Sequence, residues 1–404
     1  MALDIEYITN HTWPSVDASA VVTTELASGL ARKGHKVFVL LPNPSDEYLS
    51  PETGLPSSIP PTCTIVRWGP RLPKTLATSI GFIILLYKTI PAAFKSNMIL
   101  SHYHFMDFAT LCAAVTSKLT RRPLVVRVDD LIPGPPDGVI SHLLMNVYKM
   151  LTLWSFRQAR LILVPGDELV AVACKMYGLM KTRVEVCYNG VDTRMFSPRN
   201  RSKDLRESLG SRHILVFCSI IDKRRSSDLL VLLKAVRVLK KEIHDLKTLI
   251  IGYGPSFARV SKLEHSAAFK GSVKFLESVS TRSLVSYLAS ADVGIGPLIG
   301  STETQGAHPF KVLQYMASGA CVILGRDTVS NRLIREGFNG LYVKSGDPLD
   351  LARILRKILL DDKLAARIRS GARTTVLRTY TWEHIVSNLE PRLIDVVRDG
   401  GSSL

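Results

Sequence analysis

Segments that read as buried strands alternate with helical segments through both halves of the chain, and this alternation limits the folds that the chain can adopt. In the first half, Leu3–Thr9 and Lys36–Leu41 read as buried strands, and Ala20–Lys33 between them has apolar residues at helical spacing. The pattern starts again at His213–Ser219, a strand that is followed by the helical segment Leu229–Lys241. With 404 residues, the chain is long enough for two domains. The alternation predicts an α/β fold of two Rossmann-like, doubly wound domains.

The composition is that of a globular chain with an excess of positive charge. Apolar residues make up 46% of the chain, charged residues make up 22%, and the formal net charge is +17. Residues 1–198 hold 19 Lys and Arg against 15 Asp and Glu, a balance of +4, whereas residues 199–404 hold 33 against 20, a balance of +13. The second half therefore favours an anionic ligand or surface, such as a diphosphate or an anionic membrane. We expect no nucleic-acid partner, because the sequence has neither an interleaved aromatic–basic stripe nor zinc-finger spacing.

The cysteines and the apolar runs indicate a cytoplasmic chain. The six cysteines form no Cys-x-x-Cys pair, and several lie within apolar runs, as reduced core cysteines do. Asp4 and Glu6 interrupt the first residues, so we expect no secretory signal. The longest uncharged apolar stretch, residues 75–87 between Lys74 and Lys88, is shorter than the about 20 residues of a spanning helix. It fits either a buried domain helix or an interfacial anchor at an anionic membrane surface.

The stretch 308–319 combines features of an anion-binding helix start. Pro309 suits the first turn of a helix, because a first-turn N–H has no intrahelical partner. Helix N-termini attract anions, and Lys311 adds a full positive charge there. Gln314 lies one turn further on, on the same face as Phe310 and Lys311. These groups suit a phosphorylated, hydroxyl-rich ligand such as a nucleotide sugar, although an ordinary buried helix explains the apolar positions equally well.

This stretch resembles the donor-binding signature Pro-x-Lys-x-x-Glu-Tyr-Met-Ala-x-Gly of one subclass of the family-4 glycosyltransferases. The matching residues are Pro309, Lys311, Tyr315, Met316, Ala317 and Gly319. Gln314 stands in place of the signature's Glu, and Gly306 stands in place of a second Glu of the family. The resemblance covers nearly the whole chain and is weakest at Asp17-Ala18, where the family has a pair of glycines. Further matching strings are Lys33-Gly34-His35, Asn189-Gly190-Val191-Asp192, Phe196-Ser197-Pro198 and Gly252-Tyr253-Gly254-Pro255.

The resemblance implies a GT-B fold, in which two Rossmann-like domains face a central cleft. Residues 1–198 are the expected acceptor-side domain, residues 199–380 the donor-binding domain, and residues 381–404 a helix that crosses back to the first domain. The implied reaction moves a sugar from a nucleotide-diphosphate sugar to a glycan, lipid-linked or small-molecule acceptor, with retention of configuration. No cofactor and no metal are expected. Cations and helix N-termini would stabilise the departing diphosphate while an oxocarbenium-like sugar forms.

The residues and the resemblance together nominate two groups of site residues. The donor-binding residues expected in the second half are Arg225, Gly254, His308, Phe310, Lys311 and Gln314. The catalytic candidates follow two predicted strands, 98–102 and 124–128, and they are His104, Asp129 and Asp130. Because the carboxyl ends of parallel strands meet at one edge of a sheet, we expect these side chains to lie together, with His102. A structural role is the alternative for each histidine, and one pair of aspartates without further ligands is a weak signal for a metal.

Two other classes of protein remain open at this stage. The loss of both carboxylates, at Gly306 and Gln314, suits a catalytically degenerate GT-B protein that only binds a ligand or partner. A GT-B sugar epimerase is the other class, although it would need a set of acids and histidines that the sequence does not display. Neither the sugar, the nucleotide base nor the acceptor follows from the sequence.

Overall fold

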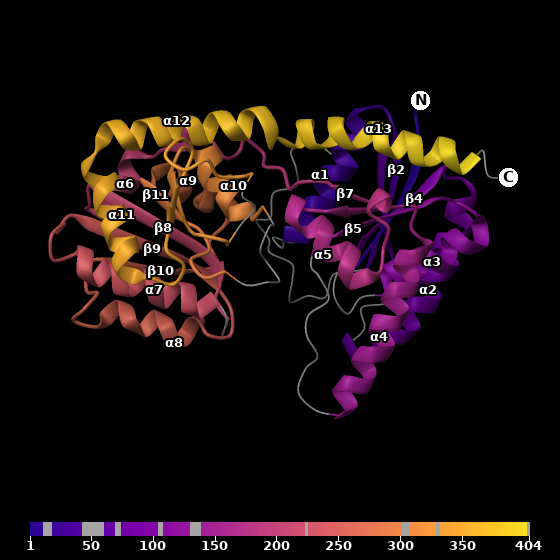
Figure 1. The fold of residues 1–404 in the computed structure, drawn as a ribbon, viewed down its shortest axis with the longest axis horizontal. Helices are drawn as coiled ribbons and strands as arrows, with labels where there is room; N and C mark the ends of the chain where they lie inside the picture. The colour runs from indigo at the N-terminus through magenta and orange to yellow at the C-terminus, as the bar shows by residue number, and fades with distance from the viewer. Residues whose placement is uncertain are drawn as a thin grey trace. The chain divides into compact units, whose positions relative to one another are not determined.

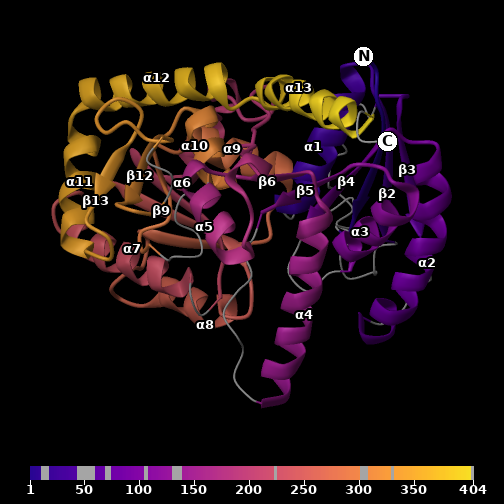
Figure 2. The ribbon, with the colours of Figure 1, turned by 45° about the vertical axis from the view of Figure 1, so that its right-hand side comes forward.

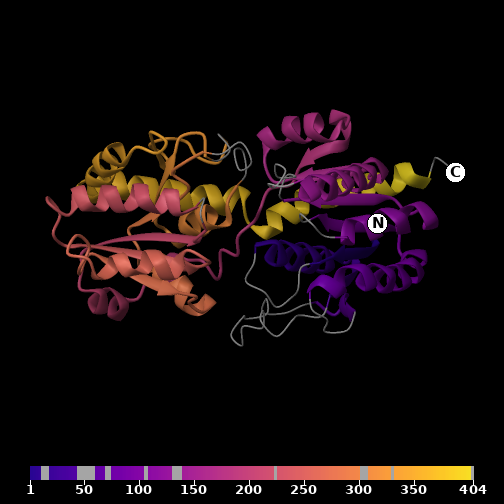
Figure 3. The ribbon, with the colours of Figure 1, turned by 90° about the horizontal axis from the view of Figure 1, so that it is seen from below.

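The computed structural model describes residues 1–10, 18–42, 60–68, 74–103, 108–129, 139–222, 225–300, 308–328 and 332–401. The chain divides into two compact units. Unit 1 consists of residues 1–188 together with residues 382–404, and unit 2 consists of residues 189–381. Each unit is built around one parallel sheet with helices on both faces, as the ribbon shows from two directions (Figures 1 and 3). The prediction of an α/β fold with two Rossmann-like domains is confirmed.

The sheet of unit 1 has seven parallel strands in the order β3-β2-β1-β4-β5-β6-β7. The strands are β1 (Asp4–Thr9), β2 (Lys36–Pro42), β3 (Cys63–Trp68), β4 (Met98–Tyr103), β5 (Leu124–Val128), β6 (Leu161–Val164) and β7 (Val184–Val186). The helices are α1 (Ala18–Arg32), α2 (Lys74–Phe94), α3 (Ala109–Thr120), α4 (Val139–Gln158), α5 (Asp167–Tyr177) and α13 (Trp382–Gly401), with a short 3-10 turn at Lys181–Arg183.

The direction of each crossover places the helices of unit 1 on two faces of the sheet. The connection from β1 to β2 runs one way along the sheet, whereas those from β4 to β5 and from β5 to β6 run the other way. Since such crossovers are right-handed, α1 covers one face, and α2, α3 and α4 form a layer on the other. Within that layer α3 packs between α2 and α4, while α13 packs on α1 (Figure 2).

The sheet of unit 2 has six parallel strands in the order β10-β9-β8-β11-β12-β13. The strands are β8 (His213–Ile220), β9 (Leu246–Tyr253), β10 (Val273–Glu277), β11 (Val293–Ile295), β12 (Cys321–Gly325) and β13 (Leu341–Val343). The helices are α6 (Lys203–Leu209), α7 (Arg225–Leu239), α8 (Phe257–Ser261), α9 (Thr281–Ser290), α10 (Phe310–Ser318), α11 (Pro348–Leu360) and α12 (Asp362–Thr379). Short 3-10 turns lie at Pro198–Asn200 and Lys262–His265.

Unit 2 begins at Asn189, earlier than the boundary after residue 198 that the sequence suggests. The reason is that the segment after Tyr188 bonds to unit 2. The Arg373 guanidinium donates to the carbonyl oxygens of Thr193, Phe196 and Ala317 at 3.0, 2.8 and 2.6 Å. The N–H of Val191 donates to Tyr380 at 2.8 Å. The Asn-Gly-Val-Asp string therefore opens the second unit.

The Lys33-Gly34-His35 string ties the sheet of unit 1 to the last helix. Nδ1 of the buried His35 accepts a hydrogen bond from the N–H of Leu3 at 3.0 Å, and Nε2 lies 3.2 Å from the Glu390 carboxylate on α13. Gly29 on α1 lies directly against Val386 of α13, since a Cβ at position 29 would stand 2.5 Å from that side chain. Close packing and a polar contact therefore hold α13 in unit 1.

The segment 349–369, which its amphipathic pattern predicts as one helix, forms two. α11 ends at Leu360, and Asp361 accepts a hydrogen bond from the N–H of Leu364 at 2.9 Å. Asp361 is thus the N-cap of α12, a role for which Asp is among the preferred residues. The prediction of a single helix was wrong, because the apolar period continues across the break.

Glu6 is an acid in the middle of the unit 1 sheet. It lies in β1 between Phe38 of β2 and Ile99 of β4, is fully buried, and its carboxyl oxygens have no hydrogen-bond partner among the described residues. Burial raises the pKa of Glu6 to about 8. The buried carboxyl group is therefore neutral at pH 7 and ionises only at a cost.

We expect the stability of unit 1 to fall as the pH rises from 6 to 8. In the unfolded chain Glu6 is already ionised there, since its ordinary pKa is 4.5, whereas the folded protein still holds the proton. Stability is then lost by about 2 kcal/mol over this window. Urea unfolding at several pH values, followed by a probe in unit 1, measures this loss. Glu6→Gln should remove most of the slope, and Glu185→Gln, at a partly exposed acid paired with Arg392, should keep it. An unchanged slope in Glu6→Gln would contradict the assignment.

Candidate active site

The sheet of unit 2 has a switch point between β8 and β11. The chain leaves β8 toward β9 on one side, and it leaves β11 toward β12 on the other. In open α/β sheets, ligands bind beyond the carboxyl ends of the strands at such a point. α10 follows β11, so its start lies at this edge of the sheet (Figure 1). The switch point of unit 2 therefore coincides with the stretch 308–319.

The sequence of α10 gives this short helix one buried face and one partly open face. Its buried residues are Val312, Leu313, Tyr315, Met316, Ala317 and Ser318, and Phe310, Lys311 and Gln314 are only partly buried. Pro309 stands before the first helical residue in an extended conformation, and no side chain of the described residues caps this start. Gly319 ends the helix at a φ of +80°, which a residue with a Cβ rarely adopts. The open face carries the residues that the sequence nominates for donor binding.

Tyr315 fixes α10 against the sheet. Its hydroxyl oxygen accepts a hydrogen bond from the N–H of Cys218 in β8 at 2.7 Å. Its ring covers Gly294 in β11, where a Cβ would stand 2.4 Å from the ring. Tyr315 therefore sets the position of the helix start relative to both strands of the switch point. The sequence matches the signature at Tyr315 but gives no sign of this role.

Lys311 places its charge at the carboxyl end of β8. Its Nζ atom lies 3.5 Å from the hydroxyl oxygen of Ser219 and 5.1 Å from the centre of the Phe217 ring. The ring supports the partly buried ammonium by a cation–π contact. The cation and the start of α10 thus point to the same edge of the sheet, and a diphosphate is a natural ligand for that pair.

Two glycines, Gly252 near the end of β9 and Gly254 just after it, keep the backbone there close to the end of β8. A Cβ on Gly252 would stand 1.9 Å from the carbonyl oxygen of Ser219, and one on Gly254 would stand 2.7 Å from that of Ile221. Gly254 also has a φ of +132°. The Gly-x-Gly-Pro turn is therefore required by close backbone packing beside Ser219, which is the neighbour of Lys311.

Asp228 holds the chain that leads from β11 to α10. Its carboxylate accepts hydrogen bonds from the N–H groups of Leu298 and Ile299 at 3.0 and 2.8 Å. The sequence predicts a helix that begins at Leu229, but α7 already begins at Arg225, so Asp228 lies within the helix. Asp228 is a buried anchor for the loop after β11.

At the matching edge of unit 1, a polar network joins three strands and α1. His102 of β4 lies with its Nε2 atom 2.8 Å from one oxygen of Asp129 and its Nδ1 atom 2.9 Å from the hydroxyl oxygen of Thr23. Arg127 of β5 donates from Nε to the other oxygen of Asp129 at 2.8 Å, and from Nη1 to the carbonyl oxygen of Cys187 after β7. The predicted proximity of His102 and Asp129 is confirmed.

The network holds a permanently charged pair. Burial by itself would raise the pKa of Asp129, but the Arg127 guanidinium and the His102 ring hold it far below its usual range. Burial disfavours the charge on Arg127, and Asp129 more than offsets this, so the pKa of Arg127 lies above its ordinary value. Asp129 is therefore an anion with both oxygens engaged, which suits electrostatic stabilisation and orientation of His102 rather than uptake of a proton.

Two family models match the chain over adjoining halves. The model described as Glycosyl transferases group 1 matches residues 195–375, and the model of Glycosyltransferase Family 4 matches residues 19–195. N-acetyl-alpha-D-glucosaminyl L-malate synthase of Bacillus anthracis is 23% identical over 396 residues, which cover 96% of each chain. The chain is a glycosyltransferase of the GT-B fold.

Solved structures agree with this fold. The Anabaena protein HepE, solved in complex with UDP-glucose, has a TM-score of 0.72 at 19% identity, over 97% of this chain and 100% of that one. Sucrose-phosphate synthase from Thermosynechococcus elongatus has a TM-score of 0.72 at 16% identity, over 98% of this chain and 99% of that one. The subclass suggested by the signature with Gln314 stays a prediction.

Several nominated residues of this glycosyltransferase lie outside the described structure. They are His104, Asp130 and the side chain of Arg225, which is the first residue of α7. Gly306, which stands in place of a Glu of the family, also lies outside the described residues. Their roles stay predictions.

His308 is described and fully buried, with its ring edge-on to Tyr380 at 5.1 Å and its carbonyl oxygen bonded to Asn189 at 3.0 Å. This packing gives His308 a structural role, and contact between its side chain and the donor stays a prediction.

Arg127 is the site residue of the glycosyltransferase that sequence reasoning missed. A single Arg inside the apolar strand Leu124–Val128 was the available signal, because a charge is almost never buried without a partner.

Among the described residues, no three His, Cys, Asp or Glu side chains come together as a metal site would require. Nor does any described helix combine the length and the apolar character that crossing a membrane demands.

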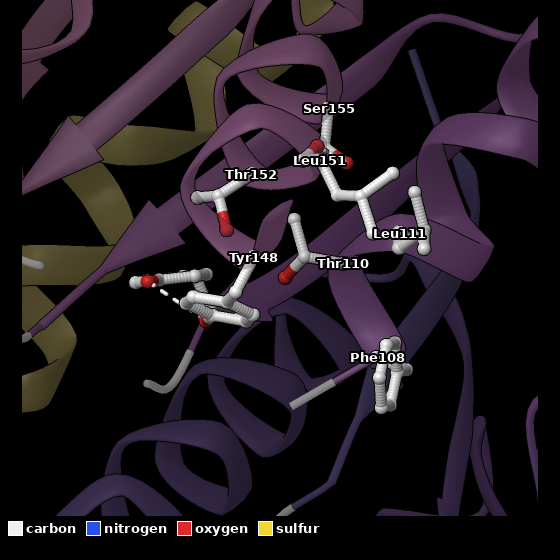
Figure 4. A pocket seen from close by; sticks show the side chains of 8 residues that line it. Phe108, Thr110, Leu111, Tyr148, Leu151, Thr152 and Ser155 are labelled. Atoms are coloured by element: carbon white, nitrogen blue, oxygen red, sulfur yellow. Dashed lines mark hydrogen bonds between the residues drawn. The ribbon is translucent and has the colours of Figure 1, made fainter. Parts of the chain in front are cut away.

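A pocket opens between α3 and α4 beside the end of β4 (Figure 4). Its lining mixes rings and aliphatic groups with hydroxyls: Tyr103, Phe108, Thr110, Leu111, Tyr148, Leu151, Thr152 and Ser155. The Tyr148 hydroxyl donates to the Tyr103 hydroxyl oxygen at 2.9 Å across one side. The pocket lies on the same sheet edge as the end of β4, on the face opposite to α1.

Proposed function

We propose that this enzyme transfers a sugar from a nucleotide-diphosphate sugar to an acceptor, with retention of configuration. The observation that carries the proposal is the position of Lys311 at the start of α10, 3.5 Å from Ser219 at the carboxyl end of β8. A cation and a helix N-terminus at a sheet switch point form a site for phosphate groups. The UDP-glucose complex of HepE, a protein of the same fold, supports this class of donor.

In this proposal unit 2 holds the donor. Lys311 and Arg225 bind the diphosphate and stabilise its charge as the bond to the sugar breaks. Gln314, one turn along the open face of α10, accepts a hydrogen bond from a ribose hydroxyl through its amide oxygen. The proposal requires no metal, because these cations and the helix start supply the positive charge.

Unit 1 holds the acceptor in this proposal. The charged pair Asp129 and Arg127 fixes His102 at the end of β4, and His104 and Asp130 follow the same two strands. The acceptor is a glycan, a lipid-linked molecule or a small molecule, and the enzyme works in the cytoplasm at or near a membrane surface.

The proposal predicts turnover with at least one nucleotide sugar. Incubation with a panel of UDP- and GDP-sugars should release nucleoside diphosphate, with water as a slow acceptor, and the sugar should first appear in its original anomeric form by NMR. Gln314→Leu should raise the Michaelis constant for that donor about tenfold, because the ribose loses one hydrogen bond. Gln314→Glu should keep or improve turnover, since a carboxylate accepts the same bond more strongly.

Other outcomes identify the remaining classes. A protein that binds the nucleotide but never releases a diphosphate would be catalytically degenerate. Conversion of the sugar into its epimer would indicate an epimerase. A Gln314→Leu variant with an unchanged Michaelis constant would show that Gln314 does not contact the ribose.

A further inference from the structure

Three neighbouring helices on one face of the unit 1 sheet, α2, α3 and α4, contain no acidic residue. With the residues directly after them, these helices span 74–95, 109–122 and 139–160. The three segments include no Asp or Glu, although the chain has 35 of these residues. The same segments contain the basic residues Lys74, Lys88, Lys95, Lys118, Arg121, Arg122, Lys149, Arg157 and Arg160. Ordinary protein surfaces mix both signs of charge, so this layer is selectively basic.

Large apolar side chains stand exposed on the same layer. On α2, Ile83 and Tyr87 are 69% and 75% exposed, and Phe94 is also exposed. Their spacing of four and seven residues places them in one stripe along the helix. The opposite side of α2 packs inward, since Leu85 and Thr89 are buried. The helix is therefore apolar on its outer side as well as on its packed side.

The stripe continues on the neighbouring helices. Met150 on α4 is 64% exposed, Val147 one turn before it is exposed, and so is Leu119 at the end of α3. Lys118 of α3 lies with its ammonium group 5.7 Å from the ring of Trp154 on α4. Single exposed apolar residues are common on proteins, but six of them among basic residues and without an acid are not.

We propose that this face of unit 1, formed by the outer sides of α2, α3 and α4, binds the surface of an anionic lipid bilayer. Apolar side chains beside cations are the combination that enters the headgroup region, and the lack of acids removes repulsion from anionic lipids. Charge selects this partner over a second copy of the chain, because two copies would bring the same basic faces together. If the proposed function holds, the acceptor is then lipid-linked, and the pocket between α3 and α4 lies next to the membrane.

Vesicle flotation tests the proposal with the full chain. At low salt, the protein should float with vesicles of phosphatidylcholine and phosphatidylglycerol and stay behind with pure phosphatidylcholine. Ile83→Glu and Met150→Glu should each lower the floating fraction about tenfold, because an acid then stands in the stripe. The matched control is Leu349→Glu on α11 of unit 2, where the leucine is 66% exposed, and it should float as the parent does.

Three results would overturn the proposal. They are absence of flotation with anionic vesicles, equal flotation with neutral vesicles, and an equal loss in Leu349→Glu. A dimer in solution that Ile83→Glu converts into a monomer would assign the face to a second copy instead. Titration of UDP into each variant separates this proposal from the proposed function, since the face lies in unit 1 and UDP binding should not change.

Discussion

Replacing Asp292 with alanine is expected to lower the free energy of unfolding of unit 2 by about 3 kcal/mol. Asp292 is a buried acid just before β11. It accepts hydrogen bonds from the N–H of Ile214 at 2.9 Å and from the guanidinium groups of Arg206, Arg201 and Arg369 at 3.3, 3.5 and 3.4 Å. Without the carboxylate, three positive groups repel one another and a buried N–H loses its acceptor. The three arginines are partly exposed, so we expect a loss of unfolding free energy at the lower end of the range for a broken buried ion pair.

Urea unfolding followed by a probe in unit 2 measures this loss. Glu242→Ala is the matched control, because Glu242 forms a 2.6 Å ion pair with Arg356 and both side chains are more than half exposed. That variant should lose less than about 1 kcal/mol, as exposed ion pairs contribute little. Equal losses in the two variants would show that Asp292 does not organise unit 2.

The architecture of both units follows from residue patterns of short range. Apolar runs of strand length, helical spacing between them and the turn at Asn189-Gly190 indicate two doubly wound domains. These patterns work because the faces of a parallel sheet are both covered, which leaves its strands almost continuously apolar. The break at Asp361 had a signal as well, since Asp before a helical run is a typical N-cap.

The polar networks could not be derived in the same way. Arg127 donates a hydrogen bond to the carbonyl oxygen of Cys187, which lies sixty positions further along the chain. Asp292 accepts hydrogen bonds from arginines of α6, of α12 and of the segment before α6. Such pairings depend on three-dimensional positions that no local pattern encodes. A charged residue inside an apolar strand, as at Glu6 and Arg127, does indicate that something unusual is buried there. The identity of its partner, or the lack of one, comes only from the fold.

Removal of the Lys311 ammonium is expected to weaken binding of a nucleoside diphosphate by a factor of about 10 to 100. A charge-assisted hydrogen bond contributes about 1.5–3 kcal/mol. The start of α10 is partly buried, so charges there are screened less than they are in bulk water. Tyr315 and Gly319 hold the helix in place without Lys311, so the fold should survive the substitution. The matched control is Lys241→Ala, which removes the same charge from an exposed position just after α7.

Calorimetric titration of UDP and GDP into the parent protein, Lys311→Ala and Lys241→Ala tests whether the diphosphate binds at Lys311. We expect that one of these nucleotides binds the parent protein, that Lys241→Ala binds it equally well, and that Lys311→Ala binds it at least about tenfold more weakly. Equal affinity in the parent protein and Lys311→Ala would contradict the placement of the diphosphate at the start of α10. Absence of binding to the parent protein would contradict the donor class itself.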